Sequence, residues 1–212
     1  GIEISAPEVN TRYINVPGRN GPLDLSEALT GFPTFKSRTI TLVFDTQSHN
    51  FDLWESKYSE ILNACHGQRL PIQLDTDSSF AYEGRITVSS EKEVLETDTL
   101  TISACVDPYK LETHSSLEPW LWDPFSFETG IVREYSDLSV NGSLTLVIPG
   151  RAMRVIPRII TSAAMTVSFQ GKTYSLLAGE NRISEICLTA GENTLEFLGE
   201  GIVSVDYRGG EL

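Results

Sequence analysis

Apolar residues at every second position constrain the fold of this chain more than any other feature. Leu144, Leu146 and Ile148 alternate with polar or small residues, and the same pattern recurs near residues 165–169 and 195–207. A period of two places alternate side chains on one face of a half-buried β-strand. Turn signals separate these segments, at Asn141-Gly142, Pro149-Gly150 and Gln170-Gly171. Many short strands at regular spacing favour a β-sandwich or jelly roll.

A repeated tetrapeptide marks two further turns in the same half of the chain. Ala-Gly-Glu-Asn occurs at Ala178 and again at Ala190. Glycine permits a positive φ angle, and asparagine hydrogen-bonds nearby backbone groups, so both residues favour turns. We therefore predict two turns of similar structure rather than a repeated domain.

One segment departs from the alternation and predicts a single long α-helix, from about Asn50 to Cys65. Asn50 is a suitable N-cap and Gly67 a suitable C-terminal stop. We interpret the apolar stripe around Trp54 as part of a core rather than as a ligand site. The stripe consists of apolar residues at helical spacing: Phe51, Trp54, Tyr58, Ile61, Leu62 and Cys65.

The stretch from Val16 to Glu27 predicts a connector that turns twice. Its turn signals are Pro17-Gly18 and Asn20-Gly21. Asp24 is placed to cap a short helix, with Glu27 as the reciprocal capping residue. Gly31 would end that helix. The connector leads into an alternating strand, Arg38–Phe44.

A long β-hairpin is predicted from Gly84 to Cys105. Both of its flanks alternate, and its charged tip spans Ser90–Asp98. Within the tip, Val94 and Leu95 are apolar where solvent is expected. An isolated two-stranded ribbon is marginal in water, and the sequence indicates no partner for it. Its apolar face must be covered either by the chain's own sandwich or by the next subunit. We expect the second, an assembly hairpin that reaches a neighbouring subunit.

We place a domain boundary after residue 111, which gives domains at 1–111 and 112–212. Residues 111–119 are mostly polar and lack periodicity. The aromatic stretch that follows contains Trp120 and Trp122. These two residues are candidates for a carbohydrate contact, and the alternative is packing at the domain junction.

Charge and hydropathy exclude several classes of protein. The chain has 29 acidic and 16 basic residues, for a net charge of −13. A nucleic-acid-binding surface needs clustered Lys and Arg, so we expect no specific nucleic-acid binding. No apolar run has the roughly 18 residues of a membrane helix. The first residues do not form a secretory signal, and without an initiator Met we expect Gly1 to be a truncation point or an added residue.

The sequence shows no arrangement of residues that carries out catalysis. Cys65, Cys105 and Cys187 are widely spaced, and we expect buried, reduced thiols. The three histidines have no zinc-site spacing. Nucleophile-elbow, phosphate-loop and dinucleotide fingerprints are absent. We expect no catalytic residue, cofactor or metal, and therefore no enzyme.

The connector motif, Val16-Pro-Gly-Arg-Asn-Gly-Pro-Leu-Asp-Leu25, resembles the N-terminal signature of siphophage distal tail proteins, the Dit family. The resemblance extends over nearly the whole chain. It includes, in order, the strand after Arg38, the Trp54 helix ending in His66-Gly67, Gly84-Arg85, Asp107-Pro-Tyr-Lys110 and the final strand Gly201–Gly210. The chain starts later than is usual for this family.

The resemblance implies a virion structural protein at the tail tip of a phage or resident prophage, made in the bacterial cytoplasm. It implies a mainly β fold, with an N-terminal tail-tube-like β-sandwich or barrel and a C-terminal galectin-like sandwich. The N-terminal domains would form a homohexameric ring through which DNA passes. Implied partners are the tail tube protein, a tail-associated lysin or fibre protein, and receptor-binding proteins. The candidate assembly contacts are Pro17, Gly18, Asp24, Val94 and Leu95.

The alternative function is a carbohydrate-binding host-adhesion protein. It depends on the C-terminal sandwich and on Trp120 and Trp122. A lectin has no use for the long N-terminal hairpin, which favours the tail-tip role. Residues 131–212 contain no Trp and no His, so we expect a sugar-binding fold without strong sugar binding.

Overall fold

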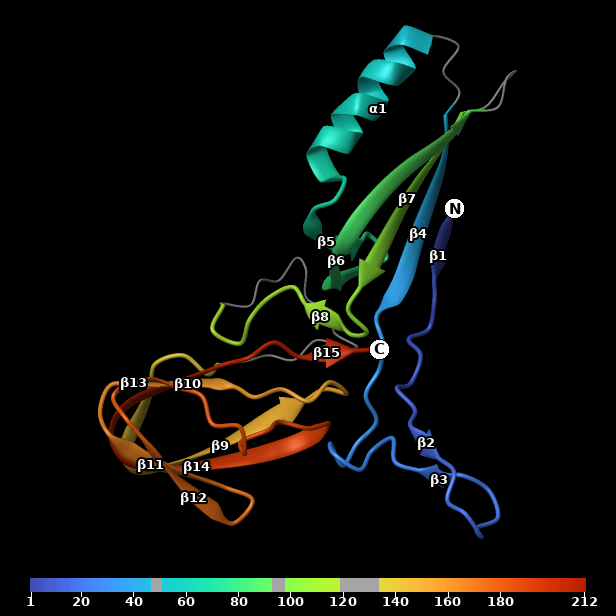
Figure 1. The fold of residues 1–212 in the computed structure, drawn as a ribbon. Coiled ribbons are helices and arrows are strands. Elements are labelled where there is room, and N and C mark those ends of the chain that lie inside the picture. The colour runs from blue at the N-terminus through green and yellow to red at the C-terminus, as the bar shows by residue number, and fades with distance from the viewer. Residues whose placement is uncertain (47–50, 93–97, 119–133) are drawn as a thin grey trace. The chain divides into compact units, whose positions relative to one another are not determined.

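The computed structural model describes residues 1–46, 51–92, 98–118 and 134–212, and within them the chain is mainly β with one α-helix (Figure 1). In chain order the elements are β1 (Ile2–Ile4), β2 (Tyr13–Ile14), β3 (Leu23–Asp24), β4 (Arg38–Thr46), α1 (Phe51–Cys65), β5 (Arg69–Leu74), β6 (Asp77–Lys92), β7 (Asp98–Val106), β8 (Lys110–Glu112), β9 (Leu138–Gly150), β10 (Arg158–Thr161), β11 (Met165–Phe169), β12 (Lys172–Leu176), β13 (Gly179–Asn181), β14 (Gly191–Asp206) and β15 (Gly210–Glu211).

The chain divides into two compact units. Unit 1 contains Gly1–Ile72 and Tyr82–Pro108, and unit 2 contains Gln73–Ala81 and Tyr109–Leu212. The β6 strand therefore belongs to both units, because it begins in unit 2 and continues into unit 1 after Ala81. The division after residue 111 that the sequence indicates stays a prediction.

The strands of unit 1 form an antiparallel sheet in the order β1-β4-β7-β6, and β5 also pairs with β6. One row across it consists of Ile40, Ala104 and Ile86, which are opposite one another in register and all buried. Residues directly opposite in a sheet point to the same face, so this row marks the core face. The described strands make one sheet, and the tail-tube-like sandwich or barrel remains a prediction.

The opposite face of this sheet carries one of the three cysteines. Cys105 pairs with Thr39 on β4 and with Arg85 on β6, and it is exposed. The prediction of a buried thiol is wrong for Cys105, because strand alternation places it opposite the core row. Cys65 and Cys187 are partly buried.

The predicted helix is present over Phe51–Cys65. It has 15 residues, or about 22 Å at 1.5 Å per residue, so it is a short helix, and the expectation of a long one is not supported. Trp54 is buried and stacks on Tyr58, with 6.0 Å between ring centroids. Asn50, the predicted N-cap, lies outside the described residues.

The end of α1 is joined to β6, beside which the helix lies (Figure 1). Gly67 has a φ of +75°, which ends the helix at the predicted residue. Its N–H donates to the Ile86 carbonyl at 2.7 Å. The Val88 N–H donates to Nδ1 of His66 at 3.0 Å. The two bonds fix the helix terminus on the strand.

In unit 2, β14 is the strand around which the second sheet is built, in the order β12-β11-β14-β10-β13 with β9 also on β14. It pairs with β9 over its whole length up to Val203, with β11 at residues 195–198, and with β10 at residues 203–206. Gly199 and Gly201 lie between these last two pairings, with φ of +146° and +143°. A Cβ at Gly199 would lie 2.7 Å from the Met165 Cβ. The glycines therefore allow β14 to change partners.

The same pairing explains one turn that the sequence predicts wrongly. Asn141-Gly142 is not a hairpin turn but lies inside β9, opposite Glu200 and Gly199. Gly142 has a positive φ, +81°, so the β9 backbone departs from regular strand geometry there. It lies opposite Gly199, where β14 passes from one partner strand to the next. The predicted Gln170-Gly171 turn is confirmed, because both residues have positive φ and join β11 to β12.

The core of unit 2 consists of the predicted alternating residues. Leu195, Phe197, Val203 and Val205 of β14 are fully buried. They form one cluster with buried side chains of the neighbouring strands and of the segment between β13 and β14, including Val140, Ile148, Ile159, Met165, Val167, Phe169, Leu176, Ile186 and Leu188. The predicted strands are confirmed, and the galectin-like assignment stays a prediction.

The repeated Ala-Gly-Glu-Asn tetrapeptide forms two turns of the same geometry, as predicted. In each turn the asparagine Oδ1 accepts from the N–H four residues earlier. Its Nδ2 donates to the carbonyls four and two residues earlier and to a carbonyl on the paired strand. The four distances are 2.9, 2.8, 3.1 and 3.4 Å for Asn181, and 3.0, 2.8, 3.1 and 3.2 Å for Asn193.

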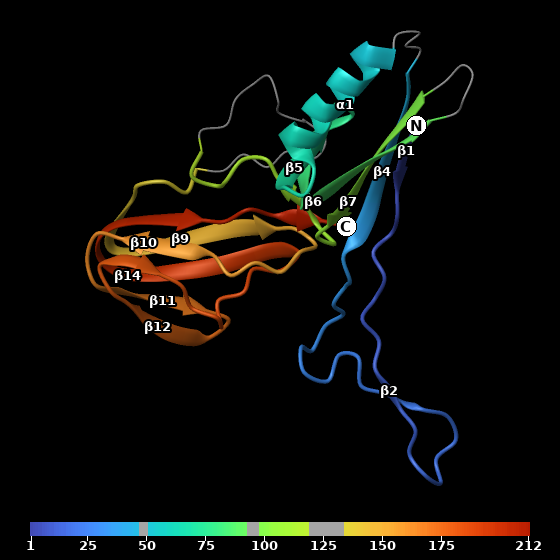
Figure 2. The same cartoon turned by 45° about the horizontal axis from the view of Figure 1, so that its top comes forward.

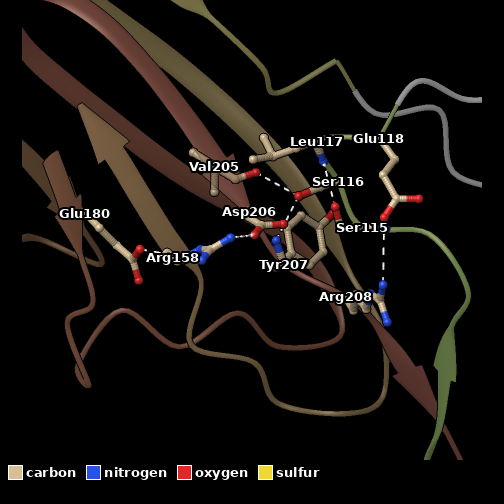
Figure 3. A network of polar contacts seen from close by, with 10 residues as sticks. All are labelled: Ser115, Ser116, Leu117, Glu118, Arg158, Glu180, Val205, Asp206, Tyr207 and Arg208. Atoms are coloured by element: carbon tan, nitrogen blue, oxygen red, sulfur yellow. Dashed lines mark hydrogen bonds and ion pairs between the residues drawn. The ribbon is translucent and has the colours of Figure 1, made fainter. Parts of the chain in front are cut away.

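Residues 115–118 are held along the end of β14 by a polar seam (Figure 3). The buried Ser116 hydroxyl donates to the Val205 carbonyl at 2.7 Å and accepts from the Tyr207 N–H at 2.8 Å. Ion pairs flank this contact: Arg158 with Asp206 at 2.5 Å and with Glu180 at 3.5 Å, and Arg208 with Glu118 at 3.7 Å. The seam fixes the chain immediately before residue 119.

Replacing Asn193 by Asp tests the turn geometry. The carboxylate cannot donate to the three carbonyls that Asn193 contacts, and the side chain is buried. We expect a loss of about 2–4 kcal/mol in the free energy of unfolding, measured by urea denaturation. Asn181→Asp is the matched control and should cost less, because Asn181 is only partly buried. A larger effect at Asn181 would contradict this reading.

Replacing Ser116 by Ala tests the seam. It removes a buried hydroxyl and leaves the Tyr207 N–H and Val205 carbonyl without it. The expected loss in unfolding free energy is about 1–3 kcal/mol, read from thermal or denaturant unfolding. Ser115→Ala should stay within about 0.5 kcal/mol of the parent, since among the described residues the Ser115 hydroxyl accepts one long bond, from the Leu117 N–H at 3.4 Å. Equal effects at both serines would show that the seam contributes nothing particular.

Candidate assembly surfaces

Residues 5–37, between β1 and β4, form a ribbon that we call the arm (Figures 1 and 2). Its two legs bond to each other at intervals along their length. The Lys36 N–H donates to the Glu8 carbonyl at 2.8 Å, and their side chains form an ion pair at 2.9 Å. Further along, Asn10 bonds to Thr34, and β2 pairs with β3. The arm is therefore a two-stranded ribbon within unit 1.

The far half of the arm contains the predicted turns and three of the predicted contact residues. Pro17 and Gly18 occupy the centre of a turn closed by the Arg19 N–H on the Val16 carbonyl at 3.2 Å. The φ of Gly18, +82°, fits the second central position of a type II turn. The structure therefore places Pro17 and Gly18 at the end of the arm, with Asp24 on β3 nearby along the same ribbon.

The short helix predicted after Asp24 is absent, and residues 25–31 form turns. The Asp24 carboxylate accepts from the N–H of Ser26, two residues on, at 2.9 Å. This bond closes an Asx turn, a contact that aspartate makes in turns as well as at helix N-caps, and here turns and not a helix follow it. Gly31 still closes a single turn by donating to the Glu27 carbonyl at 2.7 Å.

The hydrogen bonds from Ser26 also lower the pKa of Asp24, its hydroxyl contributing more than its backbone N–H. A carboxyl whose pKa is lowered in the folded chain stabilises that fold while it is ionised. The contribution is lost as the pH falls through the lowered pKa. The turn is therefore formed with an ionised Asp24 at neutral pH.

The arm exposes apolar side chains to an unusual degree for a protein surface. Leu29 is 93% exposed and Tyr13 is 58% exposed, and Val9, Ile14 and Val16 are also exposed. Exposed apolar residues gathered on one segment mark an interaction surface more often than scattered ones do. The sequence reasoning missed this property, because the only available signal was the pair of turns at the arm's far end.

The predicted hairpin is present, but it is not the free ribbon that the sequence indicated. The β6 and β7 strands pair from Gly84–Val106 to Lys92–Asp98. The β4 strand lies along the other edge of β7 over the whole of that strand. The expectation that this hairpin lacks a partner within the chain is therefore wrong, since tertiary pairing with β4 supplies one.

Four predicted site residues cannot be placed. Val94 and Leu95, at the hairpin tip, lie outside the described residues. Trp120 and Trp122 also lie outside them. Of the predicted contacts, the structure thus brings together Pro17, Gly18 and Asp24 on one ribbon.

The aromatic side chains of residues 134–212 are used for packing. Phe169, Phe197, Tyr135 and Tyr207 are buried, and Tyr174 packs against the same core. Residues 134–212 therefore present no exposed aromatic ring for a sugar to stack on.

The described residues contain no group of three or more His, Cys, Asp or Glu side chains placed to hold a metal ion. His114 contacts Glu118 at 2.8 Å, and this bond lowers the pKa of Glu118. Both side chains are about half exposed, and no nucleophile approaches them within hydrogen-bonding distance in this part of the chain. No helix in the described ranges is long and apolar enough to cross a membrane.

Comparisons with known proteins give a likeness of structure but none of sequence. No protein-family model matches the chain, and no curated protein matches it. Among solved structures it resembles the crystal structure of the SPP1 Dit (gp 19.1) protein, described as a paradigm of the hub adsorption apparatus in phages that infect Gram-positive bacteria. The TM-score is 0.56 at 12% identity, over 99% of this chain and 92% of that one. The resemblance that the sequence indicates is therefore confirmed at the level of the fold, and this chain has a Dit-like fold.

Proposed function

We propose that this chain is a structural protein of a phage or prophage tail tip. In this proposal it forms a homohexameric hub ring that joins the tail tube to a tail-associated lysin or fibre protein and to receptor-binding proteins. DNA passes through the ring, and the protein has no catalytic role. The observation that carries the proposal is the likeness to the SPP1 Dit hub over 99% of the chain. A likeness that included only the sandwich would favour a lectin equally.

The two predicted domains have different roles in this proposal. Residues 1–111 make the ring, and residues 112–212 offer a docking surface for other tail proteins. The packed aromatic residues of the range 134–212 support docking over sugar binding, since sugar sites use exposed rings. The net charge of −13 suits a ring through which DNA passes, because an acidic surface does not retain phosphates.

The arm is the contact between neighbouring subunits in this proposal. A two-stranded ribbon buries little surface by itself, and this one exposes Tyr13, Ile14 and Leu29. A neighbouring copy that covers these side chains would remove that apolar area from water. Pro17, Gly18 and Asp24 hold the end of the arm in shape for the contact. Val94 and Leu95 remain candidate contacts at the hairpin tip.

The double variant Tyr13→Ser/Leu29→Ser tests this role. Both side chains are exposed in the single chain, so the unfolding free energy should change by no more than about 0.5 kcal/mol per site. Self-association should weaken at least about tenfold, or ~1.4 kcal/mol, in sedimentation velocity at rising protein concentration. Leu177→Ser is the matched control, because Leu177 is 73% exposed in unit 2. Unchanged association of the double variant, or equal weakening by the control, would contradict an arm contact.

Sugar binding is the test of the alternative, host adhesion. We expect calorimetry with host cell-wall polysaccharide to give a Kd weaker than about 100 μM, or ~5.5 kcal/mol. Binding tighter than this that disappears in Trp120→Ala or Trp122→Ala would move the function towards adhesion. Weak binding that is unchanged in both variants fits the docking role.

A further inference from the structure

The arm carries an asparagine followed by glycine at its far end, Asn20-Gly21, and both residues are exposed. They lie in the connection between β2 and β3, after the turn at Pro17-Gly18. Within the described ranges no hydrogen bond joins the Asn20 carboxamide or the Gly21 N–H to another protein group. A Cβ placed at Gly21 would meet nothing within 4 Å. The side chain of Asn20 and the backbone nitrogen of Gly21 are therefore open to solvent and to each other.

An Asn-Gly pair is prone to deamidation, because glycine has no Cβ to hinder the approach of its own nitrogen to the preceding side chain. The glycine nitrogen loses its proton to solvent and attacks Cγ of the asparagine. The C–N bond of the carboxamide breaks, and its amino group takes a proton from solvent and leaves as ammonia. Water then opens the resulting succinimide at either carbonyl, which gives aspartate or isoaspartate. Water is the only co-reactant that the conversion needs.

A second Asn-Gly pair in the same chain lies in a different setting. Asn141-Gly142 lies inside β9, in register with Glu200 and Gly199 of β14. Formation of the succinimide requires the asparagine side chain and the next backbone nitrogen to rotate towards each other. A paired strand resists that rotation, because hydrogen bonds of the ladder would have to break. Both pairs are exposed, so strand pairing rather than exposure separates them.

We infer that Asn20 is a site of spontaneous deamidation in the free chain, and that it reacts much faster than Asn141. The pairing of β2 with β3 ends at Ile14 and Leu23. Residues 15–22 therefore form a connection outside the ladder, in which the backbone at Asn20 is able to rotate. Exposed loop ends of this kind are also where a chain most readily undergoes chemical change without unfolding.

Both products change the end of the arm. Each adds a carboxylate to a chain whose net charge is already −13. Isoaspartate also routes the backbone through the former side chain, which adds a methylene group to the connection between Ile14 and Leu23. The arm is the proposed contact between neighbouring copies, so we expect deamidated chains to associate less well. This consequence rests on the proposed hub ring, whereas the deamidation of the free chain does not.

Peptide mapping by mass spectrometry tests the site. The folded parent protein is incubated at mildly alkaline pH, and conversion to aspartate and isoaspartate is followed over time at both Asn-Gly pairs. Conversion at Asn20 should be at least about tenfold faster than at Asn141, an activation free energy lower by ~1.4 kcal/mol. Asn20→Gln is the matched variant and should show no conversion at this position, because its longer side chain closes a cyclic imide far more slowly. Equal rates at the two asparagines, or a faster rate at Asn141, would overturn the inference.

Self-association of incubated and fresh protein tests the consequence. In sedimentation velocity the parent should associate more weakly after incubation, in proportion to the fraction of Asn20 converted, whereas fresh and incubated Asn20→Gln should associate equally. Equal association of fresh and converted parent would contradict a role for the arm's end in the contact. A parent that forms no assembly, alone or in tails, overturns the proposed function instead, and the peptide map still decides whether Asn20 deamidates.

Discussion

The apolar side chains of a β-ribbon must pack against other residues to be removed from water, and this constraint applies to both units of the chain. In unit 2 the cover is internal, because β14 pairs with β9 along its length and then passes from β11 to β10. Gly199 and Gly201 permit that passage, and the inward side chains of β14 are fully buried as a result. In the arm of unit 1 the backbone pairings among the described residues join its two legs, and Tyr13, Ile14 and Leu29 stay exposed.

The elements that the sequence predicts well are those fixed by local pattern. Alternation identifies the strands around Leu146, Val167 and Phe197, and the helical stripe identifies α1. The twin turns at Asn181 and Asn193 also follow from sequence, because three of the four bonds of each asparagine side chain go to backbone groups within four residues. Such features depend mainly on residues close together in the chain, so the sequence pattern alone predicts them.

The features that the sequence does not predict depend on partners distant in the chain. Nothing local indicates that β4 covers the β6–β7 hairpin, or that Asn141-Gly142 faces Gly199 across a strand pair. The legs of the arm bond mainly through backbone groups, which leave little trace in residue type. Arg38 reads simply as the first polar residue of an alternating strand, and only the structure shows that its Nε and Nη2 atoms are buried with no hydrogen-bond partner among the described residues.

The exposed apolar side chains of the arm, Tyr13, Ile14 and Leu29 among them, are the feature that supports the proposed contact with a neighbouring copy. They occur in unit 1, to which the proposed ring is assigned. Unit 2 has a closed core and an Arg151 that is paired with Glu112 and Glu211, and it too exposes single apolar side chains such as Leu177 and Leu198.

The most direct test of the account is electron microscopy of phage tails that contain this protein, with the tail tip averaged without imposed symmetry. The account predicts a six-fold ring at the position of this protein, with density for unit 1 around a central channel. Three-fold or two-fold symmetry at that position, or the absence of the protein from the tail tip, would contradict it.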